Sequence, residues 1–139
     1  MTTRLRNQRG AALLETAITL PLILLISVGI FEFGRAYQVQ QVLTNAAREG
    51  ARVAVLEQYT DADVIAVVRT YMTSGGLTAV DPVLIRTVPV APGTGSRVTI
   101  NYPFNFMVLN PVARMVAPAS TLGSGVLNMQ ASALMRNEQ

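Results

Sequence analysis

The feature that most constrains this chain is an uncharged apolar run near its amino terminus, at residues 16–31. With the apolar residues 11–14 before it, the run approaches the roughly 20 residues that an α-helix needs to cross a bilayer core. Glu15 is the one charged residue in this stretch. A carboxylate in an apolar span is costly, so its presence marks a candidate functional residue. We therefore predict a transmembrane helix over about residues 11–34 and single out Glu15.

A short basic segment, residues 1–10, precedes the run. Its charges are Arg4, Arg6 and Arg9, and no acidic residue comes before Glu15. This bias predicts a cytoplasmic amino terminus and an exported remainder. This basic segment also fits a secretory signal peptide, but no Ala-x-Ala cleavage site follows the apolar core, which argues against removal of the apolar run. A cut after Gly10, considered below with the family resemblance, would make residues 1–10 a leader and Ala11 the new amino terminus.

Composition excludes several classes of function. The net charge is +3 over 139 residues. Without the three arginines of residues 1–10, the chain has eight arginines and eight acidic residues. The excess of positive charge thus belongs to residues 1–10, and we expect no nucleic-acid partner. The chain has no cysteine and no histidine, which argues against a disulfide framework, a zinc site or a nucleophilic triad. We predict no enzyme, no cofactor and no metal site.

Residues 11–56 have the composition of one long helix, because alanine, leucine, arginine, glutamine and glutamate dominate the second half. Pro21 cannot donate a hydrogen bond to the carbonyl of Ala17, so we expect a kink or a local loosening there. Two interpretations of Pro21 remain open. It is either a proline tolerated in a membrane helix or a hinge that lets the helix stretch in an assembly.

A seam of small residues follows on the same helix: Ala46, Ala47, Gly50, Ala51 and Ala54. Small residues let another backbone approach closely. That backbone could belong to the chain's own head, which is the part of the chain from residue 57 onward, or to a neighbouring subunit. We favour the head, because about 80 residues are too few for a large independent core and need a helix face to complete it.

Two charge pairs on this helix have a spacing of three residues, Glu32 with Arg35 and Glu49 with Arg52. Such pairs meet on a helix surface and contribute about 0.2–0.5 kcal/mol each. We interpret both as solvated surface pairs, the first at the predicted membrane boundary.

Beyond residue 57 the pattern predicts a small exported head packed on the helix. Thr60 and Asp63 resemble a capping box before a helix that ends at residues 74–76. Val64, Val67, Val68 and Tyr71 form its apolar face. Strands are expected at residues 83–90, 96–102 and 126–135, the first two as a hairpin.

Residues 103–125 read as a long apolar loop with a helical turn near residues 112–115. A loop of this length in a small domain is usually functional or mobile. We assign its apolar side chains to the core: Phe104, Phe106, Met107, Val108 and Leu109. The predicted fold class is α+β, with a long amino-terminal helix, one short helix and a small antiparallel sheet of about three strands.

Several motifs carry a family resemblance. Arg9-Gly10-Ala11, with Glu15 at the fifth position after Gly10, resembles a type IV prepilin signal. Residues 32–36 (Glu-Phe-Gly-Arg-Ala) and residues 43–52 (Leu-Thr-Asn-Ala-Ala-Arg-Glu-Gly-Ala-Arg) extend the likeness. At these spacings the chain resembles the TadE-like family of pseudopilins, densely over residues 9–56 and loosely to its end.

The resemblance implies a structural minor pilin or pseudopilin of a tight-adherence (Flp-type) pilus. Such a protein crosses the inner membrane once, with its head in the periplasm or outside the cell. A prepilin peptidase would cut between Gly10 and Ala11, and Glu15 would pair with the new amino terminus during assembly. The implied partners are the peptidase, other pilins or pseudopilins, the inner-membrane assembly platform and membrane lipid.

A second hypothesis comes from another class of protein. The chain could be an uncleaved signal-anchored protein whose head binds a ligand or a cell-wall component, with the loop at residues 103–125 as its binding surface. A membrane-tethered hydrolase is the weakest alternative, since the sequence offers no catalytic set.

Overall fold

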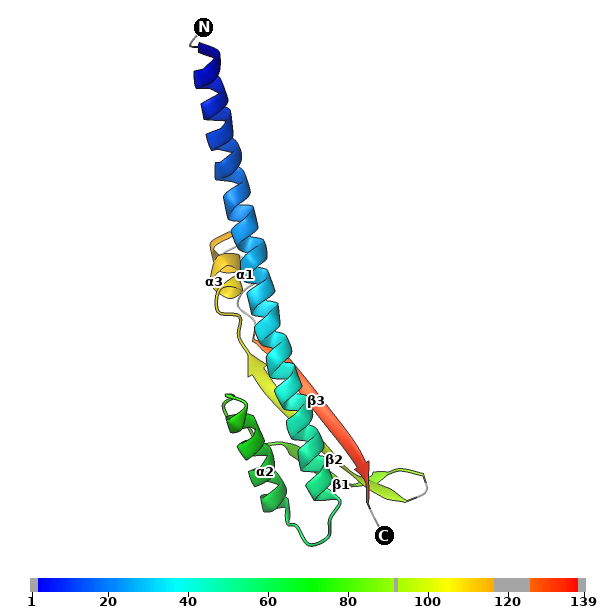
Figure 1. Ribbon diagram of the computed structural model, residues 1–139. Helices are drawn as coiled ribbons and strands as arrows, with labels where there is room; N and C mark the ends of the chain where they lie inside the picture. The colour runs from blue at the N-terminus through cyan, green and yellow to red at the C-terminus, as the bar shows by residue number, and fades with distance from the viewer. Residues whose placement is uncertain (1–2, 92, 117–125, 138–139) are drawn as a thin grey trace.

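The computed structural model describes residues 3–91, 93–116 and 126–137. Its elements in chain order are α1 (Thr3–Ala54), α2 (Asp61–Ser74), β1 (Val83–Pro89), β2 (Thr94–Phe104), α3 (Leu109–Val116) and β3 (Leu127–Arg136). Figure 1 shows the later elements gathered along the second half of α1, while its first half projects alone. The α+β prediction, with a long helix and a three-stranded antiparallel sheet, is confirmed.

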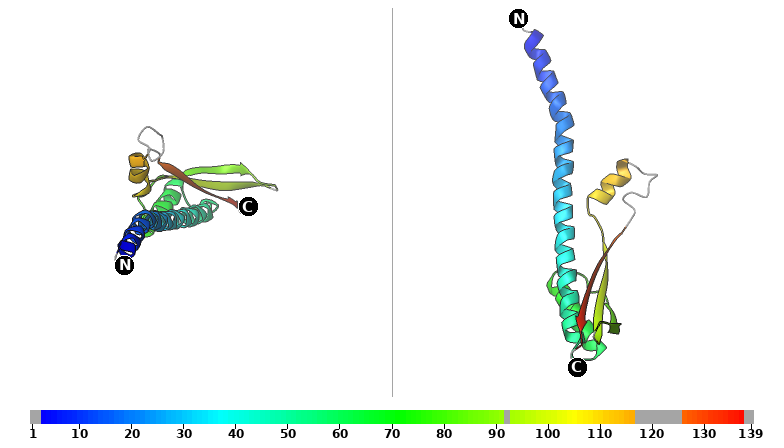
Figure 2. Two further views of the ribbon diagram at one scale, coloured as in Figure 1. Left: turned by 90° about the horizontal axis from the view of Figure 1, so that it is seen from above. Right: turned by 90° about the vertical axis from the view of Figure 1, so that its right-hand side faces the viewer.

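Helix α1 has 52 residues, which corresponds to a length of about 78 Å. It begins at Thr3, inside the predicted leader, because Arg, Leu and Gln are good helix formers. It ends at Ala54, two residues before the expected end. The helix continues through Pro21 and curves gently along its length (Figure 2).

The second half of α1 packs against both α2 and the sheet. Leu43 of α1 is fully buried, as are Val68 of α2 and Val98 and Ile100 of β2. Ala131 of β3 completes the inner face of the sheet. The head therefore has no core of its own without the helix, as its small size requires.

The sheet is antiparallel in the order β1-β2-β3. Val98 pairs with Leu84 on one side and with Ala133 on the other. Strand β2 extends two residues beyond the predicted strand at each end. The expected alternation is present, because Val98 and Ile100 are buried and Tyr102 is half-buried.

Helix α2 begins with the expected capping box. The Asp63 backbone N–H donates to the Thr60 hydroxyl, and the Thr60 backbone N–H donates to Asp63 Oδ2 at 2.8 Å. The buried face consists of Val64, Val68 and Met72. Tyr71, which we placed on the apolar face, is exposed, because the four-residue spacing of the buried positions turns it toward the helix flank.

The predicted loop at residues 103–125 differs most from the structure. Phe104 belongs to β2 and to the core, whereas Met107 and Val108 are exposed, so their assignment to the core is wrong. The chain turns outward after β2 and forms the full helix α3 rather than a single turn. Residues 117–125 of that loop lie outside the described residues.

Candidate assembly site

The head leaves the amino-terminal half of α1 uncovered up to its last turn, residues 27–31. We call residues 10–31 the free arm. Its large apolar side chains are exposed throughout: Leu13, Leu14, Ile18, Leu20, Leu22, Ile23, Leu24, Leu25, Ile26, Ile30 and Phe31. The most apolar 18-residue window has a mean hydropathy of 2.2, and none of it is buried. A surface this apolar and this long indicates a membrane anchor, compatible with a single-pass protein.

The side-chain hydroxyls of the free arm form hydrogen bonds within the helix itself. The hydroxyl of Thr16 donates to the Ala12 carbonyl, and that of Thr19 donates to the Glu15 carbonyl at 2.8 Å. Ser27 donates in the same way to Ile23. These bonds remove free hydroxyl donors from the apolar surface, as a segment in lipid requires.

Gly10, Ala11 and Glu15 all lie on the free arm and are exposed. A Cβ placed on Gly10 would meet no atom within 4 Å. Ala11 and Glu15 are one helical turn apart, about 6 Å along the axis. No ion pair reaches the Glu15 carboxylate from residues 10–91, 93–115 or 126–137, whose side chains the structure describes.

The seam of small residues faces the chain's own head. Ala46, Ala47 and Ala51 have no exposed surface. A Cβ on Gly50 would lie 2.5 Å from Val68 Cγ2 of α2 and 3.3 Å from Val98 Cγ1 of β2. The close approach that the seam permits is thus between α1 and the head of the same chain.

Glu32 is buried, and our interpretation of it as a solvated surface residue is wrong. Only 4% of the Glu32 surface is exposed, and Arg35 Nη2 donates to Glu32 Oε2 at 2.9 Å. The backbone N–H of Val108 donates to Glu32 Oε1 at 2.6 Å. Arg35 also donates to the carbonyl of Asn105. We call Glu32, Arg35, Asn105 and Val108 the latch, because they join α1 to the chain segment after β2.

Aromatic rings reinforce the latch. Phe106 makes edge-to-face contacts with Phe33 of α1 and Phe104 of β2, at ring-centre distances of 6.0 and 5.2 Å. The Arg35 guanidinium lies over the Phe104 ring, 4.7 Å from its centre. Such ring pairs contribute about 0.5–1.5 kcal/mol each beyond burial. The latch and its rings therefore hold the head against α1 at the point where the free arm begins.

A second anchor lies at the other end of α1, and sequence reasoning missed it. Arg86 of β1 donates to the carbonyls of Ala54 and Tyr59 at 2.7 and 3.0 Å, and to the Asp61 carboxylate. The hydroxyl of Ser96 also donates to the Ala54 carbonyl. These groups satisfy the carbonyl that ends the helix. Since the partners are up to 42 residues apart, no local pattern could have identified them.

The Glu49–Arg52 pair does lie on the helix surface, with both side chains partly exposed. The hydrogen bond from Arg52 is the main cause that lowers the pKa of the Glu49 carboxyl. An exposed pair of this kind contributes little to stability.

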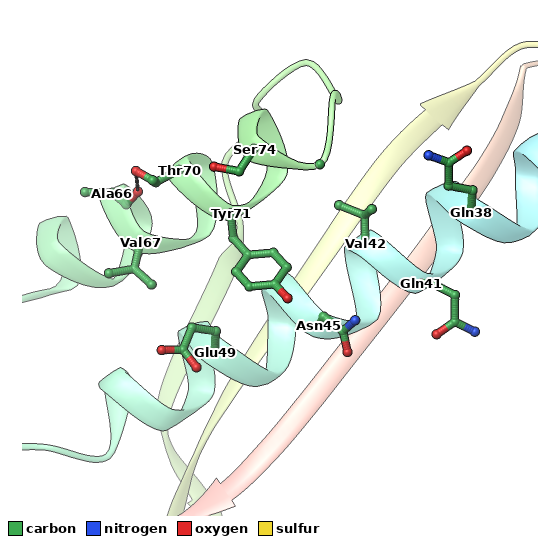
Figure 3. Close-up of a pocket in the computed structure, with 11 residues that line it drawn as sticks. Gln38, Gln41, Val42, Asn45, Glu49, Ala66, Val67, Thr70, Tyr71 and Ser74 are labelled. Carbon is green, nitrogen blue, oxygen red and sulfur yellow. Dashed lines mark hydrogen bonds between the residues drawn. The ribbon is translucent and has the colours of Figure 1, made fainter.

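An open groove of about 820 Å³ runs between α1 and α2. Figure 3 shows the Tyr71 ring reaching from α2 toward Asn45 of α1, with Glu49 nearby. No group of three histidine, cysteine or carboxylate side chains that could hold a metal occurs in the described part of the chain.

Comparison with known protein families identifies a match on α1. Residues 10–52 match the model of a family described as TadE-like protein. The resemblance drawn from the sequence is confirmed over this segment, which contains the free arm, Glu32 and Arg35 of the latch and most of the seam. No curated protein and no solved structure matches the chain. The match lies entirely on α1 and does not extend into α2, the sheet or α3.

Proposed function

We propose that this chain, TadE-like over residues 10–52, is a minor pilin or pseudopilin that takes part in assembling a tight-adherence pilus for adhesion or secretion. The observation that carries the proposal is the free arm. Its large apolar side chains are exposed on all sides of the helix, and the head approaches only its last turn. Lipid can cover such a helix before assembly, and neighbouring helices can cover it afterwards. Association of helices in a membrane is driven by van der Waals packing and hydrogen bonds rather than by the hydrophobic effect.

The proposed topology places the amino terminus in the cytoplasm and the head in the periplasm or outside the cell. The charge bias of the leader supports it. The proposed partners are a prepilin peptidase, other pilins or pseudopilins, the inner-membrane platform and lipid.

Processing would occur between Gly10 and Ala11. Both residues are exposed, and a Cβ placed on Gly10 would meet no atom within 4 Å outside the adjoining helix backbone. Glycine weakens a helix by about 1 kcal/mol relative to alanine, which favours local opening at the cut. A peptidase that needs an extended substrate could therefore engage this segment while the rest of the arm stays helical.

Glu15 is the residue that we assign to assembly. A carboxylate uncovered in lipid is costly. After the cut, the ammonium of Ala11 would lie about one helical turn away and would offer the carboxylate a partner of opposite charge. Pairing would compensate the charge as the subunit enters a filament, and would contribute specificity more dependably than stability.

The test compares Glu15→Leu with Glu57→Leu, a matched loss of an exposed carboxylate outside the arm. Two quantities are measured: the amount of protein that resists extraction of membranes with carbonate, and the amount of pili sheared from the cell surface. We expect Glu15→Leu to keep the first and lose the second, and Glu57→Leu to keep both. Unchanged pili in Glu15→Leu would favour a signal-anchored binding protein instead.

A further inference from the structure

Helix α3 occupies a distinctive place in the head. It lies at the level where the free arm leaves the head, and it is the head element nearest to the arm (Figures 1 and 2). The latch fixes this position, because the N–H of Val108, one residue before α3, is bonded to the Glu32 carboxylate.

The side chains around α3 expose apolar surface. Met107 is 70% exposed and Met115 is 84% exposed. On the neighbouring part of α1, Phe31 is 80% exposed and Phe33 is 65% exposed. We call Met107, Val108 and Met115, together with these two rings, the apolar rim.

The inner face of α3 is also incompletely covered. Leu109, Val112 and Ala113 recur at helical spacing and are only half-buried. An open cleft of about 630 Å³ lies beside the latch. Phe31, Met107 and Val108 are among its apolar lining residues, and Glu32, Arg35 and Gln38 are its polar ones. A soluble domain that ended here would leave this apolar surface in water.

The length of the free arm gives the position of this surface relative to a bilayer that the arm would span. The 21 residues from Ala11 to Phe31 span about 31 Å as a helix, close to the roughly 30 Å of a bilayer core. If the core begins at Ala11, it ends at Phe31, one residue before Glu32 of the latch. The apolar rim therefore falls in the boundary layer of the same bilayer, where aromatic side chains are enriched.

We propose that the head rests on the membrane, with the apolar rim inserted in the outer boundary between headgroups and acyl chains. Phospholipid fills the cleft and covers the exposed face of α3. This inference rests on the part of the proposed function in which the free arm spans a bilayer. An amphipathic helix beside a transmembrane segment binds such a boundary by burying apolar side chains a short distance below the headgroups.

The consequence is a defined orientation of the subunit before assembly. The transmembrane arm alone would let the head tilt and rotate over the membrane. A second contact through Met107 and Met115 would fix which face of the head points along the membrane plane. Extraction of the subunit into a pilus would then break this contact and transfer the rim to water or to a neighbouring subunit.

The absence of native cysteine allows a direct test by single labels. We would introduce Met107→Cys, Met115→Cys, Leu24→Cys and Thr87→Cys separately, all at exposed positions. Each full-length variant would carry an environment-sensitive nitrobenzoxadiazole (NBD) label and be placed, one copy per disc, in phospholipid nanodiscs. Lipids with a nitroxide high or low on the acyl chain serve as quenchers.

We expect the labels at residues 107 and 115 to show blue-shifted emission and loss of fluorescence with the shallow nitroxide. The label at residue 24, in the arm, should be quenched by the deep nitroxide. The label at residue 87, on β1, should be quenched by neither.

The outcomes separate the inference from its premise. If residue 24 is quenched while residues 107 and 115 behave like residue 87, the arm spans the bilayer and the inference is overturned. If residue 24 is not quenched, the membrane anchor itself is wrong, and the inference fails with it. If residues 107 and 115 are protected only in discs with several copies, a neighbouring chain covers the rim, which also overturns the proposal.

Discussion

Replacing Gly50 by alanine tests how closely α1 packs on its head. The added Cβ would lie 2.5 Å from Val68 Cγ2 and 3.3 Å from Val98 Cγ1, whereas carbon atoms in contact prefer about 3.5–4.0 Å. Both valines are fully buried, and valine has little rotameric freedom with which to move aside. Overpacking of this kind costs about 1–3 kcal/mol.

Helix propensity acts in the other direction, since alanine is favoured over glycine by about 1 kcal/mol in a helix. We therefore expect Gly50→Ala to lower the free energy of unfolding of the head by about 1 kcal/mol, within a range of about 0–2. Gly34→Ala is the matched control, because a Cβ there meets no atom within 4 Å. The control should be neutral or stabilising by up to about 1 kcal/mol.

The assay is urea unfolding of the full chain in detergent micelles, followed by the near-ultraviolet circular dichroism of the tyrosines in the head. Val68→Ala removes the methyl groups nearest to the new Cβ, so the double variant should lose less stability than the two single variants added together. Equal stabilisation by Gly50→Ala and Gly34→Ala would refute the reasoning, since it would mean that α1 and α2 do not approach as closely as the structure shows.

Two further predictions concern polar groups of the head. Glu32→Ala leaves the Val108 N–H without its acceptor and Arg35 without its buried carboxylate, so the free energy of unfolding should fall by about 1–3 kcal/mol. Hydrogen exchange at the Val108 amide should accelerate. Unchanged protection of that amide would contradict the latch. Hydrogen bonds from the side chain and then the backbone of Thr60 lower the pKa of Asp63 from its usual 3.8. A carboxyl with a lowered pKa in the folded state contributes stability that is present above its unfolded pKa and lost as the pH falls through its folded pKa. The first turn of α2 should therefore lose stability as the pH drops below 3.8. Amide hydrogen exchange along α2 measures this loss, and Thr60→Ala should make the exchange less dependent on pH. An equal response to acid in both proteins would disprove the assignment.

Local patterns in the sequence were sufficient for the arm, the strands and α2. The free arm is visible as a continuous apolar run, and β2 as an alternation of Val98, Ile100 and Tyr102 with polar residues. The capping box at Thr60 requires a spacing of only three residues. In each case the physical cause acts within one element, so a single window of sequence contains it.

Contacts between distant segments could not be predicted in this way. The burial of Glu32 depends on Val108, 76 residues later, and the cap on Ala54 depends on Arg86, 32 residues later. Met107 has the composition of a core residue, yet the path of the chain after β2 places it at the surface. The seam around Gly50 was visible as a row of small residues, but its partner is decided by where α2 and β2 fold back.

The central claim of the account is that this chain is a processed, membrane-anchored subunit of a pilus. Its most direct test is the intact mass of the protein purified from cells with and without the prepilin peptidase of the same system. We predict that residues 1–10 are lost only when the peptidase is present, and that the product begins at Ala11. A full-length amino terminus in both strains would contradict the claim and leave a signal-anchored binding protein as the better account.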